Sequence, residues 1–93
     1  MSKSIISNER KCVVCGTTNA LHRHHIYPSA NRKWSEKYGC WVYLCYHHHN
    51  GSNEGAHFNR KLDLELKDRC QRRFEEVYPD LDFMKIFGKN YKL

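Results

Sequence analysis

The chain has 93 residues, which is enough for one domain and too few for two. It holds 7 histidines and 5 cysteines, and its 16 lysines and arginines against 10 acidic residues give a net charge of +6. No apolar run approaches the ~20 residues of a membrane helix, and the first residues lack the apolar core of a secretion signal. We therefore expect a small, basic, metal-stabilised cytoplasmic domain without paired disulfides.

The first third of the chain is expected to contain a metal-binding turn and a strand. Residues 1–10 are polar and predict a flexible arm. Residues 11–16 predict a zinc knuckle, in which Gly16 permits the sharp turn. Residues 21–27 predict a short strand that ends at the following proline.

A second strand is expected in the middle of the chain. Residues 29–39 are polar and basic, and they predict a loop or a brief helix. Residues 41–45 are rich in β-branched and aromatic side chains, which favours a strand. Residues 47–53 are expected to interrupt any regular pattern.

The last third of the chain predicts two helices. Over residues 55–78 apolar side chains recur every three or four positions, which places them on one helical face. Pro79 ends this helix, and a short helix follows with Asp80 as its N-cap and Gly88 just beyond its end. Three pairs at i,i+4 with the acid first support the long helix: Asp63–Lys67, Glu65–Arg69 and Asp68–Arg72.

Two ligand pairs predict a structural zinc site. Cys12 and Cys15 are separated by two residues, as are Cys45 and His48. Three thiolates with one imidazole are a common tetrahedral zinc set, and one ion would tie the knuckle to the end of the second strand. The alternatives are buried free cysteines and a redox pair, but the βαβ pattern of a redox pair is absent.

The other histidines form three groups near this predicted zinc site. Any one of them alone is best interpreted as a surface or hydrogen-bonded residue, whereas three groups beside a zinc knuckle favour a second, catalytic metal site. Neighbouring strand residues point to opposite faces, so a bend before Pro28 is needed for His24 and His25 to serve one site. The groups are His22, His24 and His25; His47 and His49; and His57.

Together these motifs resemble the HNH endonucleases, which carry a ββα-metal site inside a zinc knuckle. The narrower resemblance is to the phage recombination-enhancement nucleases, which cut DNA in partnership with RecA. It runs from about residue 12 to the C-terminus. The segments that carry it are the two ligand pairs and residues 21–27, 31–33, 44–50, 55–59 and 83–88.

The resemblance implies a fold, an activity and a setting. The fold would be α+β: a zinc-stapled, treble-clef-like ββα-metal domain over residues 11–93, with a long C-terminal helix and a short helical tail. The activity would be hydrolysis of DNA phosphodiester bonds with a structural Zn²⁺ and a catalytic Mg²⁺ or Mn²⁺. The setting would be phage recombination in the cytoplasm of a bacterial host, with the RecA filament as partner and no membrane contact.

The resemblance also assigns roles to the histidines. His25 matches the general base, His24 and His49 match ligands of the catalytic ion, and His57 matches the histidine that completes that site. Cys40 departs from the family, because it stands where an asparagine usually orients the base. Asn31 or a backbone carbonyl could substitute, and the sequence leaves this open.

The residue types suit this chemistry. The unperturbed pKa of histidine, about 6.5, suits a base that deprotonates water near neutral pH. Imidazole ligands are softer than Mg²⁺ prefers, so we expect Mn²⁺, Co²⁺ or Ni²⁺ to support activity well.

Basic side chains are expected to contact DNA phosphates with weak sequence preference, since phosphate contacts carry no base information. A rival interpretation is a zinc-binding DNA or protein adaptor without hydrolysis, and a weaker third is a RING-like module with two zinc ions. The candidate DNA-binding residues are Arg23, Arg32, Lys33, Arg60 and Lys61.

Overall fold

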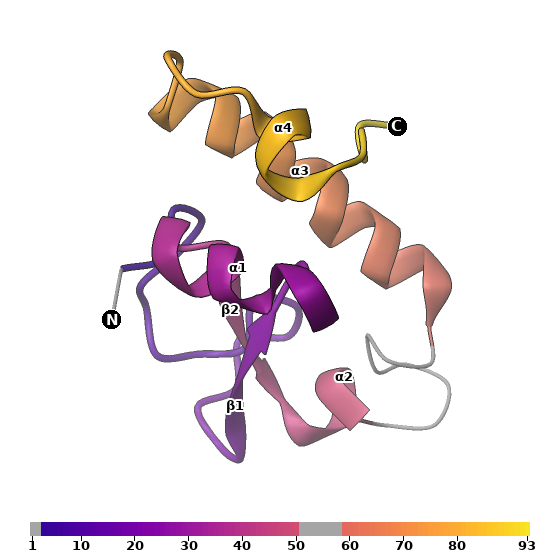
Figure 1. The fold of residues 1–93 in the computed structure, drawn as a ribbon. Helices are drawn as coiled ribbons and strands as arrows, with labels where there is room; N and C mark the ends of the chain where they lie inside the picture. The colour runs from indigo at the N-terminus through magenta and orange to yellow at the C-terminus, as the bar shows by residue number, and fades with distance from the viewer. Residues whose placement is uncertain (1–2, 51–58) are drawn as a thin grey trace.

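Two short strands form the sheet around which the other elements are arranged (Figure 1). The structure is a computed structural model that describes residues 3–50 and 59–93. Strand β1 (Leu21–His25) pairs antiparallel with β2 (Trp41–Cys45), so that Leu21 lies opposite Cys45 and His25 opposite Trp41. With its two strands and its helices, the protein is a small mixed α/β protein.

Strand β1 is two residues shorter than the predicted strand 21–27. Ile26 and Tyr27 are buried. Ile26 still follows the register of the sheet, since it lies opposite Cys40, whereas the Tyr27 amide turns to a side-chain acceptor. The Ile26 N–H donates to the Cys40 carbonyl at 3.0 Å, and the Tyr27 N–H donates to Ser35 Oγ at 3.1 Å. The chain therefore bends at the end of β1, which is the place where a bend was expected.

The segment between the strands is helical. A 3₁₀ turn, η1 (Ser29–Asn31), leads into α1 (Arg32–Tyr38), and Gly39 ends this helix with a left-handed φ of 73°. A Cβ atom on Gly39 would lie 2.1 Å from the backbone oxygen of Lys3. Glycine is thus required at this position by both its dihedral angle and its close backbone neighbour.

A short helix, α2 (Tyr46–Asn50), follows β2 directly. We expected residues 47–53 to interrupt regular structure, and this expectation is wrong for residues 47–50. Residues three apart on a helical turn lie on the same side, so a turn here brings His48 back to the side of Cys45. Residues 51–53 lie outside the described part of the chain.

The long helix is α3 (Arg60–Val77), and Asn59 caps it by accepting a hydrogen bond from the Leu62 N–H at 3.1 Å. Residues 55–58 of the predicted helix 55–78 lie outside the described residues. The pairs Asp63–Lys67 and Asp68–Arg72 form, each at 2.9 Å.

The second predicted helix is α4 (Phe83–Phe87), and Gly88 follows it with a left-handed φ of 82°. Its N-cap is Asp82, not Asp80 as predicted. The Asp82 carboxylate accepts hydrogen bonds from the N–H groups of Met84 and Lys85, which are the exposed donors of the first turn.

An aromatic core joins the two helices α3 and α4 to the rest of the chain. Tyr27 lies centrally in it, with ring centroids 5.3 Å from Phe83 and 4.6 Å from Phe87. Its hydroxyl donates to the Lys67 carbonyl of α3 at 2.7 Å. Figure 1 shows α3 and α4 together on one side, with the sheet and α2 toward the opposite end.

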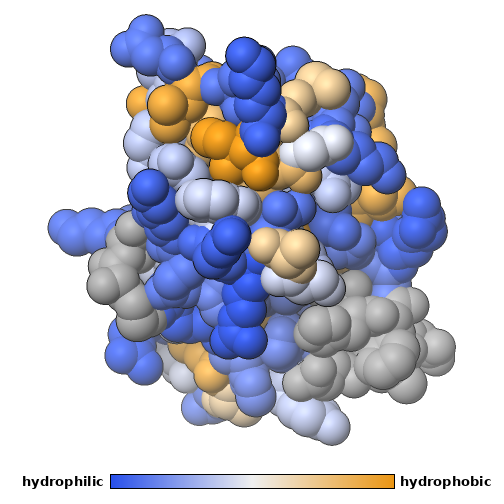
Figure 2. Space-filling view, viewed as in Figure 1, coloured by the Kyte–Doolittle hydropathy of each residue, from blue (hydrophilic) through white to orange (hydrophobic). Residues whose placement is uncertain are grey.

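Residues of the expected N-terminal arm contact this framework. Ser4 is buried, and its hydroxyl donates to the Trp41 carbonyl at 2.6 Å. The Ile5 N–H donates to the Gly39 carbonyl at 3.0 Å, and the Ile5 carbonyl accepts from Arg73 Nε at 2.9 Å. Of the helices in the described ranges, none combines the length and apolar character needed to cross a membrane. Hydrophilic side chains dominate the face seen in Figure 2.

Candidate metal centre and histidine pocket

The two predicted zinc-ligand pairs come together at one point. Cys12 and Cys15 belong to the knuckle, Cys45 ends β2, and His48 lies on α2. Their four ligand atoms all lie within 4.8 Å of one another. A zinc tetrahedron with bonds of 2.0–2.3 Å has edges of about 3.5–3.8 Å. The observed separations are 3.3 Å for Cys45 Sγ to His48 Nδ1, 3.7 Å for Cys12 Sγ to His48 Nδ1, and 3.9 Å for Cys15 Sγ to Cys45 Sγ. This group could therefore hold a metal ion such as zinc.

Backbone hydrogen bonds hold the knuckle in shape and against the sheet. The Cys12 N–H donates to the Thr17 carbonyl and the Gly16 N–H donates to the Cys12 carbonyl, both at 2.8 Å. Gly16 has a φ of 78°, as expected for the glycine of the turn. The Val13 N–H donates to the Tyr43 carbonyl of β2 at 3.0 Å. The two ligand pairs are thus positioned by contacts that do not involve the metal.

The electrostatic environment of the cluster favours a thiolate at Cys12. Burial opposes ionisation of this thiol, but the backbone N–H groups of Cys45, Cys15 and Val14 outweigh burial and lower the pKa of Cys12 to about 6. The thiolate is the form of cysteine that binds metal ions.

Beside the cluster, three histidines border one hollow of about 260 Å³, which we call the histidine pocket. His24 is buried, and its ring lies nearly perpendicular to that of His49 with the centroids 5.4 Å apart. His25, the last residue of β1, also borders the pocket. The complete lining is Arg23, His24, His25, Pro28, Ser29, Arg32 and His49.

A carboxylate that the sequence reasoning missed contacts the candidate base. Oε2 of Glu36 lies 2.6 Å from Nε2 of His25, and Oε1 lies 3.5 Å from Nη2 of Arg23. The hydrogen bond from His25 lowers the pKa of Glu36, against the smaller opposing effect of burial and with help from the nearby Arg23 charge. One signal was present in the sequence: Glu36 is the only acidic residue between Glu9 and Glu54.

Asn31, one of the two substitutes considered for the missing asparagine, makes a different contact, and Cys40 stands at the position of that asparagine. The side-chain amide of Asn31 donates to the Phe87 carbonyl at 3.0 Å and so ties the start of α1 to α4. Cys40 is fully buried in the hydrophobic core.

The remaining histidines surround these two sites. The ring of His22 lies 5.2 Å from that of His49, and the exposed ring of His47 lies 5.0 Å from that of His48. His57, the expected third ligand of the catalytic ion, lies outside the described residues.

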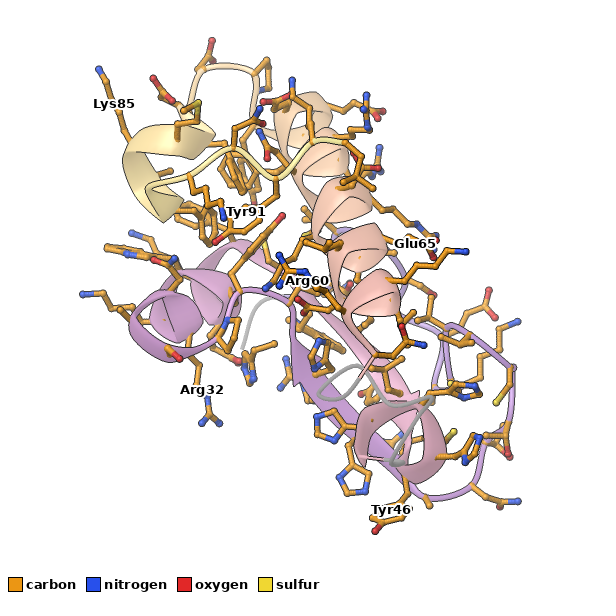
Figure 3. The ribbon with its side chains drawn as sticks, turned by 90° about the vertical axis from the view of Figure 1, so that its right-hand side faces the viewer. Arg32, Tyr46, Arg60, Glu65, Lys85 and Tyr91 are labelled. Carbon is orange, nitrogen blue, oxygen red and sulfur yellow. The ribbon has the colours of Figure 1, made fainter. Side chains whose placement is uncertain are left out.

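The five candidate DNA-binding residues fall into two regions. Arg23, Arg32 and Lys33 border a second hollow of about 600 Å³ together with His25 and Glu36, which we call the glutamate pocket. Lys61 borders a different hollow beside His48, and Arg60 is exposed at the start of α3. Figure 3 shows Arg32 and Arg60 at the beginnings of α1 and α3.

The fold and the site together define a small mixed α/β protein with a candidate metal centre made of three cysteines and one histidine. Comparison of the chain with protein-family models, with curated proteins and with solved structures gives no match.

Proposed function

We propose that this chain is a metal-dependent DNA endonuclease of the HNH class with His25 as its general base. The observation that carries the proposal is the histidine pocket, in which His25 meets His24 and His49 next to the Cys/His cluster. The order of β1, β2 and α2 supports a ββα-metal motif, since β1 supplies His24 and His25 and α2 supplies His49. The resemblance to the phage recombination-enhancement nucleases gives the reaction.

In the proposed reaction the imidazole of His25 accepts a proton from a water molecule, and the resulting hydroxide attacks phosphorus. The P–O3′ bond breaks, the 3′-oxygen takes up a proton, and the products are a 5′-phosphate and a 3′-hydroxyl. His24 and His49 would hold a divalent ion that stabilises negative charge on the phosphate and on the leaving oxygen. Neutral imidazole ligands would leave that ion its full positive charge.

The rim of the pocket is suited to a polyanion. Arg32 borders both hollows next to His25 and is exposed, and Lys33 is its exposed neighbour. A phosphate that reaches His25 would pass these two cations. Such contacts bind without base specificity, so we propose DNA as a substrate with weak sequence preference and with binding that weakens as salt increases.

The test is cleavage of supercoiled plasmid and of single-stranded DNA by the zinc-loaded chain with Mn²⁺, Co²⁺, Ni²⁺ or Mg²⁺ added. We expect cleavage with the first three ions, loss of at least about 100-fold in the His25→Ala variant, and little change in His47→Ala. His47 is the matched control because it is an exposed histidine outside the histidine pocket. Activity with Mg²⁺ equal to that with Mn²⁺ would contradict the all-histidine ligand set.

The assay also separates the rival functions. Each reaction is run with and without RecA filaments, because the resemblance alone suggests that partner. DNA binding without cleavage under every condition would favour the zinc-binding adaptor. The metal content of the purified protein gives the remaining distinction. Two inert zinc ions per chain would favour a RING-like module, whereas one tightly bound zinc and a second exchangeable site fit the nuclease.

A further inference from the structure

The carboxylate of Glu36 engages one particular nitrogen of His25. The 2.6 Å separation between Oε2 and Nε2 is a short hydrogen bond, of the kind formed when one partner is charged. An ionised carboxylate can only accept hydrogen bonds, so Nε2 of His25 has to carry the hydrogen. In a neutral imidazole this leaves Nδ1 as the nitrogen with a free lone pair.

Glu36 is itself held in place from the sheet. Arg23 lies two residues before His25 on β1, so both side chains point to the same face of the strand. The Arg23 guanidinium lies 3.8 Å from the centroid of the Trp41 ring and 3.5 Å from the second oxygen of Glu36. The carboxylate of α1 therefore bridges two neighbouring side chains of β1, which restricts the rotation of both.

The two hollows share His25, Arg23 and Arg32 in their linings and differ in their other residues. Glu36 borders the glutamate pocket and is absent from the histidine pocket, whereas His24 and His49 border only the histidine pocket. His25 borders both. Since Nε2 of His25 is hydrogen-bonded to Glu36, Nδ1 is the nitrogen left to accept a proton.

We propose that Glu36 is a positioning residue that fixes His25 with its hydrogen on Nε2 and its basic Nδ1 toward the histidine pocket. In this chain Glu36 takes over the task that the resemblance gives to the asparagine replaced by Cys40. The part of the proposal that concerns catalysis rests on the proposed nuclease function, while the part that concerns the tautomer does not.

The tautomer can be measured directly by ¹⁵N NMR of the histidine side chains in the zinc-loaded full chain, at alkaline pH where imidazole is neutral. The signal of His25 is assigned by its loss in His25→Ala. We expect the Nε2–H form in the wild type and in Glu36→Gln, whose amide oxygen still accepts, and a loss of that preference in Glu36→Ala. Glu36→Met keeps the volume without an acceptor and replaces the alanine variant if that variant does not fold. Glu76→Ala is the matched control, because Glu76 is an exposed glutamate on α3.

Cleavage kinetics provide the second readout. We expect kcat to fall by about 10- to 100-fold in Glu36→Ala with KM changed less than about twofold, and Glu36→Gln to recover most of the rate. Zinc content and the circular dichroism spectrum should stay as in the wild type. An unchanged tautomer in Glu36→Ala overturns the proposal, whereas a changed tautomer with an unchanged kcat overturns its catalytic part. If the wild type cleaves no DNA, the nuclease proposal fails separately, and the tautomer still decides whether Glu36 orients His25.

Discussion

The side chains of the candidate zinc site come from segments 30 residues and more apart, and each depends on its local backbone. Cys12 and Cys15 are placed by the hydrogen-bonded knuckle, whereas His48 is placed by the single turn of helix after Cys45. A structural zinc ion contributes on the order of 10 kcal/mol to the folding of small peptides. The whole stability of a small domain is about 5–15 kcal/mol. The loss of one ligand should therefore threaten the whole fold.

We expect Cys12→Ser to lose stoichiometric zinc and to unfold, because a serine hydroxyl replaces a buried thiolate ligand. Zinc content by elemental analysis and thermal melting by circular dichroism measure both effects. Cys70→Ala is the control, since Cys70 is a buried cysteine of α3 outside the cluster and its removal should leave one zinc per chain. A Cys12→Ser protein that melts cooperatively near the wild-type temperature would contradict the assignment of a structural zinc site.

A second residue-scale prediction concerns Tyr27. Tyr27→Phe removes the hydroxyl that donates to the Lys67 carbonyl but keeps the ring among Phe83 and Phe87. We expect a loss of about 1 kcal/mol in the free energy of unfolding, measured by urea denaturation. Tyr46→Phe alters an exposed tyrosine, so it should change stability by less than about 0.5 kcal/mol. Equal effects of the two substitutions would show that the hydrogen bond contributes nothing.

At the scale of the secondary-structure elements, the ends of the helices determine how the chain continues into the next segment. Helix α1 ends at Gly39, where a left-handed residue and the close approach of Lys3 coincide. Helix α4 also ends at a left-handed glycine, Gly88, but among the described residues no atom beyond its chain neighbours lies within 4 Å of the place where a Cβ would stand. The two glycines therefore share a dihedral requirement and differ in their surroundings.

Gly88→Ala should cost about 1–2 kcal/mol, the strain of a left-handed alanine. Gly39→Ala should cost at least about 1 kcal/mol more, because its Cβ would also collide with the backbone of the N-terminal segment. Urea denaturation of the two variants side by side measures the difference. Similar losses would mean that the N-terminal segment moves away from Gly39 without cost.

At the scale of the whole molecule, two centres hold the chain together. The aromatic core around Tyr27 joins α3 and α4 to the end of β1, and a metal ion held by the Cys/His cluster would join the knuckle to β2 and α2. The histidine pocket has side chains from β1, α1 and α2 in its lining, and its residues Pro28 and His49 directly follow Tyr27 of the core and His48 of the cluster. The pocket should therefore keep its shape only when both centres are intact.

Removal of zinc by a strong chelator should reduce the cooperativity of thermal unfolding and lower the melting temperature. Addition of zinc should restore the original melting curve, whereas addition of Mg²⁺ should not, since thiolate ligands select soft ions. Differential scanning calorimetry before chelation, after chelation and after each addition measures this. If the melting curve is unchanged after chelation and zinc is shown to be absent, a metal ion does not contribute to the stability of the fold.

The amino-acid sequence by itself determined the two strands, the long helix and the four candidate zinc ligands. These follow from local patterns: side-chain periodicity, pairs of ligands two residues apart, and glycine or proline at the ends of elements. It also identified a bend before Pro28 as the condition for His24 and His25 to serve one site. The catalytic role of His25 and the DNA substrate remain proposals that the resemblance and the pocket support.

Only the tertiary structure decided which residues that are distant in the sequence contact one another. Nothing local connects Glu36 to His25, since they lie on different elements and meet only when α1 folds back along β1. Asp82 rather than Asp80 caps α4, because the position of the cap depends on how Phe83 and Phe87 enter the core. Residues 46–50 become helical where the pattern predicted a break, since the turn aligns His48 with Cys45. The Glu36–His25 contact and the approach of His48 to Cys12 join segments distant in sequence, and no local pattern predicts such contacts.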